Sequence, residues 1–218
     1  MVGADRFAVP PERLGAWLER WAAEHGGGVR TDVRPGRVTY LAADGAQVTC
    51  DPPFPPLPAA ALGVAEACVT APLIEHAARD RVVGVLLVRL GGHAAGVFSG
   101  SRLVASKVGR RQVHGRNRAG GSSSGRFARR RENQARDALA DAADVAARVL
   151  LPHRSDLDAV VLGGDRRALG TVVEDPRLRG LRRLAGEEIF DVPDPRLDVL
   201  RRMPERFRAT VLRPSPPG

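Results

Sequence analysis

The sequence predicts a mixed α/β protein with a small α+β region at its N-terminus. Three observations lead to this prediction. A β-type run over residues 81–108 is broken by turn signals, which indicates an antiparallel meander of three strands. A long amphipathic pattern over residues 125–151 then predicts a helix. After Pro152, which cannot continue that helix, strand and helix signals alternate as they do in α/β domains.

The first eighty residues contain the predicted α+β region. Trp17 and Trp21, together with leucines at the intervening spacings of three and four, form one apolar stripe and predict a helix over 11–25. Residues 51–58 contain five prolines, so they cannot form a helix or a central strand. The remaining expected elements are strands at 29–40 and 46–50 around a turn at Asp44-Gly45, and a helical or irregular connection at 59–79.

The second part of the chain predicts a more regular domain. Residues 157–162 are nearly continuously apolar, which is typical of a strand buried on both faces. A later helix is expected to begin with Asp194 as its N-cap and Pro195 in its first turn. The expected elements are strands at 81–89, 95–99 and 102–108, a helix at 125–151, a strand at 157–162, a helix at 166–173, a strand at 189–192, a helix at 194–202 and a strand at 207–212.

This element order is that of an RNase H-like or related α/β topology, in which a meander and a long helix precede the strand–helix alternation. We therefore expect three parts in the chain. The predicted boundaries are an N-terminal α+β region with its proline-rich linker at 1–80, an α/β domain at 81–213 and a loose tail at 214–218.

Nearly all of the charge imbalance lies in one segment. Residues 102–136 contain ten arginines, the chain's single lysine (Lys107) and one acid (Glu132), so their formal charge is +10 in a chain of net charge +9. The middle of this segment, residues 120–125, is Gly-Gly-Ser-Ser-Ser-Gly and carries no bulky side chain. A conformationally free tip flanked by arginines favours contact with a polyanion, and nucleic acid is the expected one.

A fixed order of residues surrounds this glycine tip. His114-Gly115-Arg116 precedes Gly120-Gly121, and Arg126-Phe127-Ala128-Arg129 opens the predicted long helix. This order resembles the catalytic loop of eukaryotic and archaeal class 1 peptide-chain release factors, and the spacing from Gly120 to Arg129 fits without a gap. Within that superfamily the chain is most similar to the actinobacterial branch of Vms-like release factors. The resemblance covers about residues 81–213 and leaves residues 1–80 outside.

The resemblance implies a ribosome-associated peptidyl-tRNA hydrolase that acts in ribosome rescue or quality control. Water would attack the ester between peptide and tRNA at the peptidyl-transferase centre, and the implied partners are large-subunit rRNA and peptidyl-tRNA. Adjacent glycines permit close backbone approach, and backbone N–H groups can face a developing oxyanion. The implied catalytic residues are Gly120, Gly121, Ser122 and Gln112. The implied nucleic-acid-binding residues are Lys107, Arg110, Arg111, His114, Arg116, Arg118, Arg126, Arg129, Arg130 and Arg131.

The chain departs from the release-factor pattern at one position. Ser122 stands where the family has the glutamine of Gly-Gly-Gln, and Gln112 is the nearest glutamine on the N-terminal side. Hydrolysis therefore has an alternative, a non-catalytic ribosome- or tRNA-binding module that has lost the catalytic glutamine.

A metal-dependent nuclease is a further alternative, because that chemistry needs carboxylates gathered around metal ions. Asp158, Asp165, Glu174 and Asp175 are instead expected to be strand-end and loop residues. No metal, cofactor or membrane partner is expected, and the protein is predicted to be a cytoplasmic monomer. Two cysteines match no zinc pattern and are expected to be buried and reduced: Cys50 and Cys68.

Overall fold

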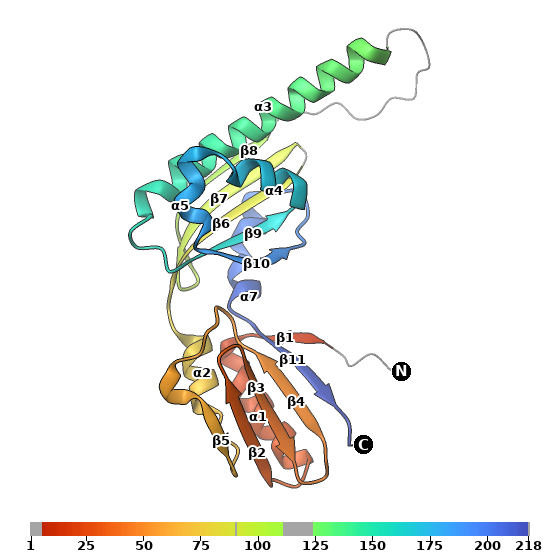
Figure 1. Cartoon of the computed structure of the whole chain (residues 1–218), viewed down its shortest axis with the longest axis vertical. Helices are drawn as coiled ribbons and strands as arrows, with labels where there is room; N and C mark the ends of the chain where they lie inside the picture. Colours follow the sequence, from red (N-terminus) through yellow and green to blue (C-terminus); the bar gives the residue numbers. More distant parts are fainter. Residues whose placement is uncertain (1–5, 90, 111–123, 218) are drawn as a thin grey trace. The chain divides into compact units, whose positions relative to one another are not determined.

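The computed structural model describes residues 6–89, 91–110 and 124–217, and the chain divides into two compact units (Figure 1). The first unit comprises Met1–Arg79 and Pro204–Gly218, and the second comprises Asp80–Met203. The strand order is β1-β11-β4-β3-β2-β5 in the first unit's sheet and β10-β9-β6-β7-β8 in the second. The predicted mixed α/β class is confirmed.

The first unit is a six-stranded antiparallel sheet with its core on one face. Helix α1, amphipathic as predicted, lies against this sheet (Figure 1). It contributes Leu14 and Leu18 to the core, together with Leu73 of α2. Its elements are β1 (Phe7–Val9), α1 (Pro11–Glu24), β2 (Val29–Arg34), β3 (Arg37–Ala42), β4 (Gln47–Asp51), a 3-10 turn (Ala59–Ala61), β5 (Gly63–Ala65), α2 (Ala71–Ala78), all of α7 (Met203–Phe207) except its first residue, and β11 (Thr210–Ser215).

Several expectations for this unit were wrong. The run 29–40 forms two strands rather than one, because Pro35 lacks an N–H for the ladder and Pro35-Gly36 makes a turn. Strand β5, which pairs with β2, falls in the stretch expected to be helical or irregular. Cys50 is buried as expected, whereas Cys68 is exposed.

The C-terminal residues belong with the N-terminal ones, which differs from the expected division at 80 and 213. Strand β11 pairs antiparallel with β1 on one side and β4 on the other. Its pairing continues through Pro214 and Ser215, which were assigned to a loose tail. The hydrogen bonds of the ladder hold these residues in the first sheet.

The second unit contains the predicted antiparallel meander followed by a long helix. Asp194 does not cap the late helix, which is short and has Arg196 at its N-cap without a side-chain bond. Helix α5 and the 3-10 turn before it were not predicted. The elements are β6 (Val82–Arg89), β7 (Gly92–Ser99), β8 (Arg102–Arg110), α3 (Ser124–Leu150), a 3-10 turn (Leu151–His153), β9 (Ala159–Gly164), α4 (Arg166–Val173), a 3-10 turn (Pro176–Leu178), α5 (Arg179–Arg182), β10 (Ala185–Phe190) and α6 (Leu197–Arg201).

The centre of the second sheet is buried on both faces. Leu86 and Val97 pack with α3, α4 and α5 in one core. On the opposite face, α6 packs closely against β7, since a Cβ added to Gly96 would lie 3.0 Å from Cδ2 of Leu200. Phe98 of β7 is also fully buried. Strand β9 lies between β6 and β10 and runs parallel to both, as its continuous apolar sequence favours.

Candidate nucleic-acid interface

The predicted catalytic residues lie outside the described residues. Gly120, Gly121, Ser122 and Gln112 belong to 111–123, as do four predicted nucleic-acid contacts: Arg111, His114, Arg116 and Arg118. Four others, at positions 126, 129, 130 and 131, belong to the first turns of α3, where the structure describes only the helical backbone. The structure therefore describes strand β8, which precedes this segment, and helix α3, which follows it.

Strand β8 leads into the segment from the edge of the sheet. Lys107 and Arg110, the predicted contacts on this strand, are both exposed, and 71% of the Arg110 side chain is accessible. Arg102 and Val104 of β8 are exposed as well. The strand thus exposes basic side chains near its start, past its middle and at its end.

Helix α3 leads out of the segment and is anchored through its C-terminal half. Its buried side chains between Ala138 and Leu150 are mostly alanine and valine, small enough to bring the helix close to β7. Glu132 and Asn133, nearer the N-terminus, are exposed. Figure 1 shows the N-terminal turns of α3 extending beyond the sheet of this unit. The N-terminal turns of α3 therefore project from the core that anchors the rest of the helix.

The carboxyl ends of β6, β8, β9 and β10 lie at the same end of the sheet, where the segment begins. Ion pairs fix the chain there. Arg110 Nη2 is 3.7 Å from Asp194 Oδ2, and Arg89 Nη2 is 2.5 Å from Asp191 Oδ1. These exposed contacts are individually weak, but they join the last residues of β6 and β8 to the connection after β10.

A buried histidine lies beneath this end of β8. His93 on β7 is 3% exposed and stands opposite Gly109 in the ladder. A Cβ on Gly109 would lie 2.0 Å from the Nε2 atom of His93, so only glycine leaves room for the ring. This Nε2 lies 3.5 Å from Oδ2 of Asp141 on α3, and among the described residues it has no hydrogen-bond partner. Burial lowers the pKa of His93, and Asp141 partly opposes that effect.

His93 and Asp141 join β7, β8 and α3 at the base of the segment, and the sequence did not single them out. A histidine in a strand of small residues, opposite a glycine in the next strand, was the available signal. This signal is informative only when the pairing register of β7 with β8 is known, and the sequence pattern alone does not determine that register.

The three aspartates considered for a nuclease have structural roles. Asp158 Oδ2 accepts a hydrogen bond from the Val82 amide at 2.8 Å, and Asp165 Oδ1 caps α4 through the Ala168 amide at 2.8 Å. Asp175 accepts from Arg177, which lowers the pKa of the carboxyl to about 2. Over the described ranges, no group of three or more potential ligands could hold a metal ion.

Fold and site together define an α/β protein that inserts a strongly basic segment between an edge strand and a projecting helix. A family model described as "Actinobacteria/chloroflexi VLRF1 release factor" matches residues 81–213. The chain belongs to this release-factor family, which confirms the resemblance found in the sequence. Membership implies a ribosome-associated, release-factor-like role. No helix in the described part of the chain is long and apolar enough to cross a membrane.

Solved structures with similarity to this chain include two archaeal proteins at 15% identity. One is the archaeal translation termination factor aRF1, with 88% of this chain and 68% of that chain covered at a TM-score of 0.44. The other is described as an archaeal protein, with 89% of this chain and 69% of that chain covered at a TM-score of 0.42. Pelota of Archaeoglobus fulgidus is 11% identical, with 95% and 65% covered and a TM-score of 0.32. No individually curated protein sequence matches the chain.

Proposed function

We propose that this protein hydrolyses the ester of peptidyl-tRNA at the peptidyl-transferase centre and so releases nascent peptide from the large ribosomal subunit. The observation that carries the proposal is the release-factor family match over residues 81–213, because that range contains the Gly120-to-Arg129 pattern. The setting in translation also makes the cytoplasm its expected location.

The proposed roles follow from the chemistry of each residue type. Gly120 and Gly121 let the backbone approach the ester, and the N–H of Ser122 faces the developing oxyanion. Gln112 orders the attacking water. The arginines on either side hold the segment against rRNA and tRNA phosphates, for which guanidinium groups are suited by their paired donors.

We also propose that the second unit is RNase H-like. In support, in the strand order β8-β7-β6-β9-β10 only the second strand of the unit, β7, runs opposite to the other four. The long helix follows the third strand, and α4 follows the fourth. In this arrangement the chemistry lies in the inserted segment rather than at the strand ends.

A peptide-release assay tests the hydrolytic function. Stalled ribosomes that carry labelled peptidyl-tRNA are incubated with the protein, and free peptide is measured over time. Release is expected with the wild-type chain. It should fall by roughly 100-fold or more with Gly120→Val or Gly121→Val, the scale of losing an oxyanion donor. Gly36→Val, in an exposed turn with no neighbouring atoms within 4 Å, is the control for the same substitution elsewhere.

The second candidate is a non-catalytic ribosome- or tRNA-binding module, which Ser122 in place of glutamine favours. Co-sedimentation with ribosomes at rising salt then shows binding that weakens steeply, without release above background. Ser122→Gln and Gln112→Ala separate the two candidates. If Ser122→Gln creates release, the scaffold is competent and the natural tip is inactive; if Gln112→Ala abolishes wild-type release, Gln112 takes part in the chemistry.

A further inference from the structure

One face of the first unit's sheet carries no part of that unit's core. Along β2, β3, β4 and β11, alternate side chains enter the core shared with α1 and α2, and the residues between them point the other way. We call this second set the open face: Arg30, Asp32, Arg34, Arg37, Thr39, Leu41, Gln47, Thr49, Asp51, Val211, Arg213 and Ser215. These side chains are exposed or half-buried.

The open face has an excess of positive charge, with four arginines and two aspartates. Arg34 and Arg37 stand directly opposite each other in the β2–β3 ladder. Like charges in that position destabilise a sheet, so strand pairing does not explain why both residues are arginine. Arg30, at the far end of β2, is 3.2 Å from Glu66, and both of these side chains are largely exposed.

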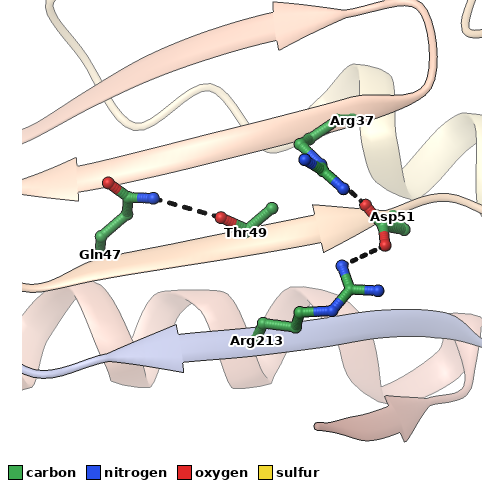
Figure 2. Close-up of polar contacts among 5 residues, drawn as sticks. All are labelled: Arg37, Gln47, Thr49, Asp51 and Arg213. Atoms are coloured by element: carbon green, nitrogen blue, oxygen red, sulfur yellow. Dashed lines mark hydrogen bonds and ion pairs between the residues drawn. The ribbon is translucent and has the colours of Figure 1, made fainter. Parts of the chain in front are cut away.

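The arginines are held in place by carboxylates that do not use up their donors. Asp51 accepts from Nε of Arg37 at 3.0 Å and from Nη1 of Arg213, which comes from the far side of β4 (Figure 2). Asp32 lies 2.9 Å from Nε of Arg34. A guanidinium has five N–H donors, so each arginine keeps several for a ligand while its position is restrained.

Short polar groups lie between the arginines. Thr39 and Thr49 are opposite each other at the centre, and Gln47 donates to Oγ1 of Thr49 at 3.2 Å (Figure 2). Four adjacent strands at about 4.8 Å spacing make this face roughly 15 Å wide. The open face contains no aromatic side chain, so it cannot stack unpaired bases as surfaces for single strands do.

We propose that the open face binds the sugar–phosphate backbone of structured RNA, as a second RNA-contact surface in addition to residues 102–136. The guanidinium groups match phosphates, and the hydroxyl and amide groups match 2′-hydroxyls in the wide, shallow minor groove of an A-form helix. This contact does not depend on ester hydrolysis, and it gives the first unit a function of its own.

The test measures binding of the full-length chain to a fluorescent RNA hairpin across a series of salt concentrations. The double variant Arg34→Gln/Arg37→Gln should reduce the slope of log affinity against log salt by roughly 2, because each phosphate contact contributes about one. The matched control is Arg13→Gln/Arg20→Gln, which removes the same charge from exposed positions of α1. The control should leave the slope within experimental error of the wild type.

The same pair of variants is then made in a chain that also carries Arg129→Gln/Arg130→Gln. Independent contacts add, so the decrease of about 2 should persist in this background. If the decrease disappears there, or if the control lowers the slope equally, the open face does not bind RNA. A polyglutamate peptide that binds the wild type with the same sensitivity to Arg34→Gln/Arg37→Gln would also overturn the proposal, in favour of an acidic protein partner.

A gain-of-charge variant covers the case in which the double variant unfolds. Thr49→Lys adds a cation at the centre of the open face and should steepen the salt slope by roughly 1. An unchanged slope in a folded Thr49→Lys chain contradicts the proposal. None of these measurements uses peptide release, so failure of the hydrolytic function and failure of this RNA contact are distinguishable.

Discussion

The two sheets of this protein differ in how they are covered. In the second unit, β6 and β7 are buried over most of their length on both faces. In the first unit, β3 and β4 alternate between buried and accessible side chains. A sheet covered on both faces is left with its edges and ends for binding, and here the basic segment leaves from an edge strand. A sheet covered on one face can instead offer its second face to a partner.

Truncation of a large buried side chain tests this difference most strongly. Phe98→Ala in β7 should lower the free energy of unfolding by about 3–5 kcal/mol, because Phe98 is fully buried. Leu41→Ala on the open face should change it by less than about 0.5 kcal/mol, since Leu41 is 39% exposed. Urea titration followed by circular dichroism measures both. Similar losses for the two variants would show that the open face is covered.

A glycine in each unit gives the next largest contrast. Gly109→Ala should cost about 1–3 kcal/mol, because its Cβ would overlap the ring of His93. Gly36→Ala has no neighbouring atom within 4 Å and should be neutral or slightly stabilising. Thermal unfolding compares them with the wild type. A neutral Gly109→Ala would mean that the His93 ring is not held against β8.

The helix caps of the two units predict a smaller effect. Asp165→Ala should cost about 1 kcal/mol, because its carboxylate accepts the Ala168 amide at the start of α4. Thr70→Ala at the start of α2 should cost only a few tenths of a kcal/mol, because Thr70 makes no side-chain cap bond. Melting temperatures report the difference, and equal shifts for the two variants would be inconsistent with these caps.

The smallest expected effect is a pH dependence from His93. Burial lowers the pKa of His93 in the folded state, with partial opposition from Asp141. The unfolded chain therefore binds this proton at higher pH, near the ordinary value of about 6.5, and stability falls as pH drops below it. In His93→Gln this loss should be reduced. Melting temperatures between pH 7.5 and 5 measure it, and equally steep curves for both proteins would remove His93 as the cause.

Local sequence patterns determined most of the second unit. The apolar periodicity located α3, and the helix predicted at 166–173 coincides with α4. Turn residues separated the strands of the meander. The same logic failed at Pro35-Gly36, where a two-residue turn divides a continuous β-type run into β2 and β3. Local patterns predict an element correctly when its backbone conformation depends on residues close together in the chain.

The sequence alone predicted only part of the candidate site. The spacing around Gly120 and Gly121 identified the segment and its family, because that pattern lies within a short stretch of the chain. Tertiary structure decided that β11 joins the first sheet, that Asp194 pairs with Arg110 rather than capping a helix, and that His93 is buried against Gly109. Each of these depends on strand order and register between distant residues, which local periodicity does not specify.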